Sequence, residues 1–120
     1  MKKILIISTD EELIQGITFF LNDYFQIRTS ADIKKIRGSQ NIFNSDAVFL
    51  DIDIDVNDHI DGLMLLKEIK SYHPSLPVIA FSCCLAQKVI KCALRLGAAD
   101  YLIKPLDLKL FQSCLEDVFP

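Results

Sequence analysis

Cysteine and histidine patterns that bind metal are missing from the 120-residue chain. The chain has four cysteines and two histidines, but no two cysteines are spaced as C-x-x-C and each histidine stands alone. A zinc site is therefore not expected. We expect the cysteines to be reduced thiols, mostly buried, as in a cytosolic protein.

An excess of positive charge and a long apolar run are also missing. The net charge is -3, which gives no electrostatic reason to bind nucleic acid or an anionic membrane. The one basic cluster, Lys34, Lys35 and Arg37, is interpreted as a solvated helix face. Apolar stretches are too short to cross a bilayer, and residues 4–7 are too short for the core of a signal peptide. We expect a cytoplasmic protein without direct nucleic-acid or membrane contacts.

The four glycines form neither G-x-G-x-x-G nor a phosphate-binding P-loop. No order of serine, histidine and acid, or of cysteine and histidine, indicates a nucleophilic enzyme. A small metal- or nucleotide-using enzyme is therefore the least favoured interpretation, and we expect no enzymatic activity.

The chain does contain short apolar runs, and these alternate with segments whose apolar residues have helical spacing. Short apolar runs predict five strands, at residues 3–7, 25–29, 47–50, 78–81 and 101–103. Helical spacing follows each strand: from an N-cap at Thr9 with Glu12 completing a capping box, from 30–32, over 62–72, over 86–96 up to Gly97, and from an N-cap at Asp107.

Strands that alternate with helices favour a parallel sheet covered by helices on both faces. The length suits one domain, residues 1–120. We predict an α/β, flavodoxin-like (βα)5 fold with strand order 2-1-3-4-5.

Three polar residues each close an apolar run: Asp51, Ser82 and Lys104. In the predicted fold these strand ends meet at the carboxyl edge of the sheet, where open α/β sheets bind ligands. A carboxylate can accept a phosphoryl group, a lysine supplies counter-charge, and a hydroxyl donates a hydrogen bond. Taken singly, the three residues have other interpretations, as turn, cap or solvated side chains. Together they favour phosphorylation of Asp51.

The chain resembles a two-component response regulator receiver domain over essentially its full length. The resemblance rests on residues 3–7, 46–51, 61–66, 77–82 and 97–105. It implies that Asp51 accepts a phosphoryl group from a sensor histidine kinase or phosphotransfer protein, with Mg²⁺. It also implies that Lys104 contacts the phosphoryl group, that Ser82 and Tyr101 shift in response, and that the Lys104-Pro105 bond is often cis.

The sequence departs from the family just after the first strand, where receivers carry two acidic residues that help to hold Mg²⁺. Here Ser8 and Thr9 stand there, and neutral hydroxyls are poor replacements. Asp10 is expected to serve the helix dipole, with a role at the metal as the alternative. For Asp53 a solvated acidic loop is favoured, with a metal contact as the alternative. Cys83 follows Ser82, at a position where receivers commonly have a smaller residue. Our hypothesis is that its larger side chain restricts access to the phosphoryl group.

Two functions remain open. The favoured one is a phosphoacceptor switch that signals to a downstream effector or output domain through the face formed by helix 86–96, strand 101–103 and the last helix. That face is also a candidate homodimer surface. The alternative is a pseudo-receiver, a protein-interaction module that works without phosphorylation.

Overall fold

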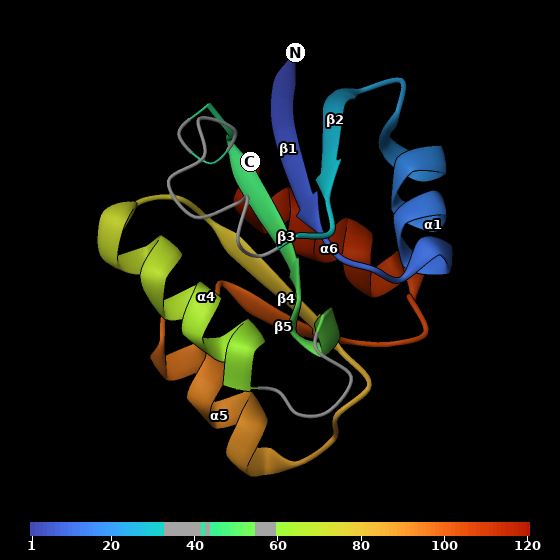
Figure 1. The fold of residues 1–120 in the computed structure, drawn as a ribbon. Coiled ribbons are helices and arrows are strands. Elements are labelled where there is room, and N and C mark those ends of the chain that lie inside the picture. The colour runs from blue at the N-terminus through green and yellow to red at the C-terminus, as the bar shows by residue number, and fades with distance from the viewer. Residues whose placement is uncertain (33–41, 43, 55–59) are drawn as a thin grey trace.

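A five-stranded parallel sheet forms the centre of the computed structural model, which describes residues 1–32, 42, 44–54 and 60–120 (Figure 1). Its strand order is β2-β1-β3-β4-β5, which confirms the predicted fold. The strands are β1 (Lys2–Ile7), β2 (Phe25–Ser30), β3 (Ala47–Asp51), β4 (Val78–Ser82) and β5 (Asp100–Ile103). The described helices are α1 (Glu11–Leu21), α4 (Ile60–Tyr72), α5 (Gln87–Arg95) and α6 (Leu108–Val118), with a 3-10 turn, η1 (Ile52–Ile54), after β3.

Helices cover both faces of the sheet because successive strand residues point to opposite faces. Helices α1 and α6 lie on one face, and α4 and α5 lie on the other (Figure 1). Strands β3 and β4 are buried along their whole length, as expected for central strands of a sheet covered on both sides. The strand order places the carboxyl ends of β3 and β4 between those of β1 and β5 at one edge of the sheet.

Three phenylalanine rings connect the central strands to the last helix. Phe49 of β3, Phe81 of β4 and Phe111 of α6 form T-shaped pairs with centroids 5.4 to 6.0 Å apart. All three are at most 1% exposed. Edge-to-face pairs of this kind add about 0.5–1.5 kcal/mol each beyond the area they bury. The packing beneath the site therefore depends on residues from three separate elements.

Two helix ends agree with the sequence prediction and one N-cap differs, while α4 begins at Ile60, two residues before the predicted start at Gly62. Gly97 follows α5 with a φ of 109°, and the Asp107 side chain caps α6, both as predicted. The prediction that Thr9 caps the first helix is wrong, because Asp10 is the N-cap and accepts a hydrogen bond from the Leu13 amide. The capping box with Glu12 is wrong for the same reason.

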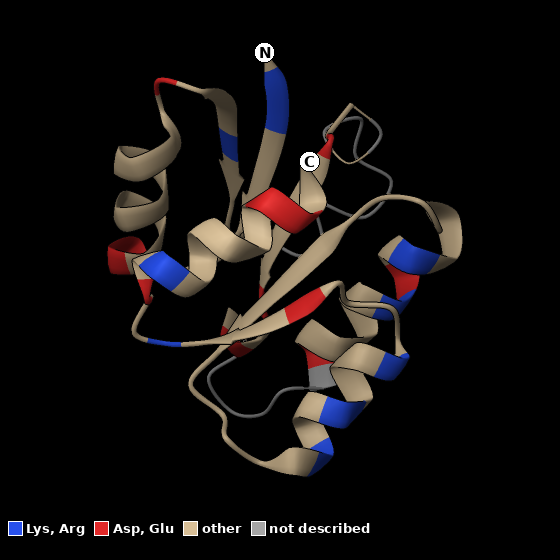
Figure 2. Cartoon of the chain, turned by 180° about the vertical axis from the view of Figure 1, so that it is seen from behind, with Lys and Arg blue, Asp and Glu red and all other residues tan. Residues whose placement is uncertain are grey.

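The helix expected from 30–32 falls mostly outside the described residues, as do Lys34, Lys35 and Arg37. Ser30 itself belongs to β2. Figure 2 shows that α5 carries basic and no acidic side chains among its charged residues. No helix in the described part of the chain is long and apolar enough to cross a membrane.

Candidate functional site

Strand register brings the carboxyl ends of β1, β3, β4 and β5 to one edge of the sheet. Ile7 pairs with Leu50, so Ser8 lies level with Asp51. Asp51 pairs with Phe81, so Ser82 lies one residue further on. Lys104 follows Ile103, the partner of Ser82, and the Lys104-Pro105 bond is cis. The sequence prediction that these ends converge is confirmed.

Asp51 is the most buried carboxylate of the site, with a side chain only 1% exposed. Its Oδ2 accepts hydrogen bonds from Ser8 Oγ at 2.6 Å and Lys104 Nζ at 2.8 Å. Its Oδ1 accepts one from the Asp53 amide at 2.9 Å. Burial of a charge is tolerated when it is paired and hydrogen-bonded in this way. The carboxylate is thus held in one orientation by donors from three separate segments of the chain.

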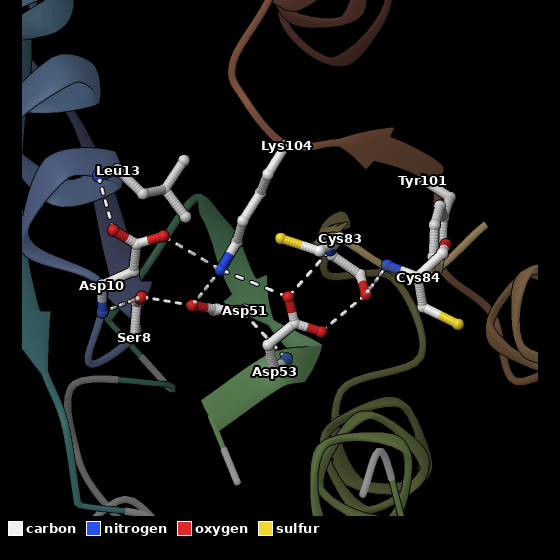
Figure 3. Close-up of polar contacts among 10 residues, drawn as sticks. Ser8, Asp10, Leu13, Asp51, Asp53, Cys83, Cys84, Tyr101 and Lys104 are labelled. Atoms are coloured by element: carbon white, nitrogen blue, oxygen red, sulfur yellow. Dashed lines mark hydrogen bonds and ion pairs between the residues drawn. The ribbon is translucent and has the colours of Figure 1, made fainter. Parts of the chain in front are cut away.

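The Lys104 ammonium lies at the centre of the site, with a side chain 9% exposed. Its Nζ pairs with three carboxylates, those of Asp51 at 2.8 Å, Asp10 at 3.1 Å and Asp53 at 3.4 Å (Figure 3). Burial alone would lower the pKa of Lys104, but the hydrogen bond and charge of Asp51, followed by the other carboxylates, raise it. The lysine is therefore held in its charged form.

Asp10 serves both the helix and the site. One oxygen accepts the hydrogen bond from the Leu13 amide at 3.1 Å, and the other faces Lys104 (Figure 3). Burial would raise the pKa of Asp10, but the Leu13 amide and Lys104 outweigh it and lower the pKa. The expectation that Asp10 serves only the helix is wrong, because a cap residue still has a second oxygen to direct elsewhere.

Asp53 also points into the site, so the favoured interpretation of it as a solvated loop residue is wrong. Turn η1 buries Ile52 and directs the next side chain to the carboxyl edge. The Asp53 carboxylate accepts hydrogen bonds from Ser82 Oγ at 2.6 Å and the Cys83 amide at 2.8 Å. Burial would raise the pKa of Asp53, but these bonds and Lys104 lower it.

Ser82 connects the site to Tyr101. Its hydroxyl donates to Asp53 and accepts a hydrogen bond from the Cys84 amide at 2.9 Å. The Cys84 carbonyl in turn accepts a hydrogen bond from the Tyr101 hydroxyl at 3.0 Å. Ser82 does not cap the next helix, since Ala86 is the N-cap of α5. Cys83 is exposed beside these groups.

The donor chemistry of the site suits a hard divalent cation. Three carboxylates face one ammonium, and Mg²⁺ favours carboxylate and water oxygens. Among the described residues, no three acidic, histidine or cysteine side chains form a group that could hold a metal ion, but the three carboxylates that face Lys104 supply oxygen donors and a net negative charge. The residues therefore match Mg²⁺ in chemistry and excess negative charge.

The sheet and its edge define the class of the protein: a flavodoxin-like α/β domain with an acidic site at the carboxyl ends of its strands. The chain belongs to the response regulator receiver domain family, whose model matches residues 4–116.

Similar proteins agree with this assignment. A two-component response regulator from Clostridium difficile is 29% identical, with a TM-score of 0.85 over 99% of this chain and 96% of its own. The transcriptional regulatory protein KdpE of Staphylococcus aureus is 31% identical over 88% of this chain, which spans 45% of KdpE. ZraR of Escherichia coli is 44% identical over 48% of this chain, which spans 13% of ZraR. The BeF3-activated DrrB receiver domain, 18% identical with a TM-score of 0.84 over 99% of this chain and 97% of its own, shares the fold.

Proposed function

We propose that this domain accepts a phosphoryl group on Asp51 from a sensor histidine kinase or phosphotransfer protein and acts as a switch, not as an enzyme. The observation that carries the proposal is the buried Asp51 carboxylate with the Lys104 ammonium 2.8 Å away. A carboxylate nucleophile needs counter-charge for the phosphoryl oxygens that approach it. Lys104 is charged and already in place.

The transfer itself is a simple exchange of bonds. A carboxylate oxygen of Asp51 forms a bond to phosphorus, while the bond from phosphorus to the histidine nitrogen of the donor breaks. The electron pair stays on the departing imidazole, which then takes up a proton. Lys104 balances the charge of the transferring group. The Ser82 hydroxyl, which donates to Asp53 at 2.6 Å, can donate to a phosphoryl oxygen once it leaves that carboxylate.

We propose that Mg²⁺ supports this transfer, held by Asp51 and Asp10. The ion would neutralise the negative charge that the site carries in excess of Lys104. Ser8 and Thr9 replace the acidic pair of the family, so the affinity for Mg²⁺ is expected to be weaker. Asp10, which lies 3.1 Å from Lys104, supplies one of the missing carboxylates from one residue further along the chain.

The proposed output face consists of α5, β5 and α6, the same face that the sequence indicated. The helices and the strand that form it carry exposed apolar side chains, namely Leu94, Ile103, Leu108 and Leu110. Tyr101 lies on β5 and is bonded to the loop that follows Ser82, so a change at the site can reach this face. We propose that the face docks a downstream effector or output domain, or a second copy of the chain, in the cytoplasm.

The alternative is a pseudo-receiver that docks partners without phosphorylation. One observation favours it: both oxygens of Asp51 already accept hydrogen bonds, from Ser8, Asp53 and Lys104. A phosphodonor must displace at least one of them.

Intact-mass measurement after incubation with acetyl phosphate separates the two functions. The sample contains Mg²⁺ or a chelator, and an Asp51→Asn variant is the control. A gain of one phosphoryl group that requires Mg²⁺ and Asp51 supports the switch. No gain at saturating donor and metal contradicts it and leaves the pseudo-receiver.

A further inference from the structure

The Asp53 carboxylate fills a position that is built to hold an oxyanion. Three donors of different kinds converge on it: the Ser82 hydroxyl at 2.6 Å, the Cys83 amide at 2.8 Å and the Lys104 ammonium at 3.4 Å. They come from the end of β4, the loop after it and the residue after β5. Hydroxyl, amide and ammonium donors would serve phosphoryl oxygens equally well.

The same carboxylate lies directly beside the proposed phosphoacceptor. The Asp53 amide donates to Asp51 Oδ1 at 2.9 Å, and both carboxylates contact the same Lys104 nitrogen. A phosphoryl group on Asp51 would therefore enter the space next to Asp53 and compete for its donors. Two anions that share one set of donors repel each other, so only one can hold them.

Asp53 also begins a continuous chain of hydrogen bonds that ends on β5. Ser82 donates to Asp53 and accepts from the Cys84 amide, and the Cys84 carbonyl accepts from Tyr101. Figure 3 shows the labelled residues Asp53, Cys84 and Tyr101 in this order along one line. The carboxylate therefore holds the two residues that were expected to respond to phosphorylation.

We propose that Asp53 is an internal substitute for the phosphoryl group. In the unphosphorylated chain it holds Ser82, the loop after β4 and Tyr101 in the arrangement that phosphorylation would impose, and it must leave before a phosphoryl group can bind. The inference rests on the proposed function and deepens it. Asp53 is then a competitor of the phosphoryl group and not a metal ligand. Loss of a competitor strengthens binding of a phosphoryl group, whereas loss of a metal ligand weakens it.

The internal contact is tested first without any phosphodonor, by NMR of the Cys83 amide and of fluorotyrosine at Tyr101. In Asp53→Ala the Cys83 amide proton is expected to move upfield, and the Tyr101 signal to shift. Asp10→Ala is the matched control, because it removes a carboxylate from Lys104 but none from Ser82 or Cys83. A Cys83 signal that is unchanged in Asp53→Ala, or that shifts equally in Asp10→Ala, overturns the proposal.

Competition is tested by titration with beryllium fluoride, a phosphoryl mimic, in the presence of Mg²⁺. Loss of one charge-assisted competitor is expected to lower the half-saturating concentration in Asp53→Ala about tenfold, which corresponds to about 1.4 kcal/mol. Weaker binding in Asp53→Ala would instead make Asp53 a metal ligand and overturn the proposal. If Asp53→Ala does not fold, Asp53→Asn removes the charge at nearly constant shape.

The two proposals fail in different ways. If neither the natural chain nor the variant binds beryllium fluoride or accepts a phosphoryl group, the switch function fails. The Cys83 shift in Asp53→Ala still decides whether the internal contact controls the loop, because that measurement involves no phosphodonor.

Discussion

Replacement of Lys104 by methionine should destabilise the domain far more than loss of a surface ion pair. Methionine has similar length but no charge, so it leaves Asp51 buried at 1% exposure without its counter-ion. Removal of one partner from a buried pair typically costs about 3–5 kcal/mol. Domains of this size are stable by about 5–15 kcal/mol, so the variant should fold but unfold at a clearly lower urea concentration.

A double-mutant cycle with Asp51→Asn identifies the cause. The amide removes the stranded charge, so Lys104→Met should cost less in the Asp51→Asn background than in the natural chain. Residues in direct contact show coupling energies of about 0.5–3 kcal/mol, and we expect the upper half of that range. Urea unfolding followed by circular dichroism at neutral pH gives all four free energies. A loss below about 1 kcal/mol for Lys104→Met, typical of an exposed pair, would refute the reasoning.

Other positions give predictions of opposite sign. A Cβ at Gly62 would lie 2.5 Å from the backbone oxygen of Ile52, so Gly62→Ala should destabilise the domain by about 1–3 kcal/mol. A Cβ at Gly16 would have no neighbour within 4 Å, so Gly16→Ala should stabilise the domain by about 0.5–1 kcal/mol. Urea unfolding checks both, and equal effects would contradict the steric argument. Burial, followed by the charge of Asp100, raises the pKa of the Cys114 thiol to about 12. Iodoacetamide at pH 8.5 should therefore leave Cys114 unmodified in the folded protein while it alkylates the exposed Cys83. Peptide mass mapping, with a urea-unfolded sample as the control, checks this prediction. Modification of Cys114 at the rate of the unfolded chain would contradict its burial.

The sequence predicts the sheet and the central triad of the site well, for one physical reason. Strands covered on both faces are continuous apolar runs, so each ends visibly where a polar residue follows. Asp51, Ser82 and Lys104 stand at such ends, and the parallel sheet brings them to one edge. The local apolar pattern therefore identifies these three positions in the sequence, and the register of the sheet then brings them together.

The roles of Asp10 and Asp53 could not be predicted in the same way. Helix caps are uncertain by a residue from sequence, because Thr9 and Asp10 are both good caps. The direction of Asp53 depends on the 3-10 turn over Ile52–Ile54, which has no strong periodicity. The pattern of an apolar Ile52 between two acids was the available signal, since a buried Ile52 requires its neighbours to point the other way.

The ring cluster of Phe49, Phe81 and Phe111 has a consequence for how the domain is made. A nascent chain that ends after Lys104 would already contain every residue of the site. It would still expose Phe49 and Phe81, whose third ring belongs to α6. The charged residues would thus be synthesised before the apolar support beneath two of their strands is complete. The last helix, which contributes no residue to the site, is therefore the last part of its apolar support to be synthesised.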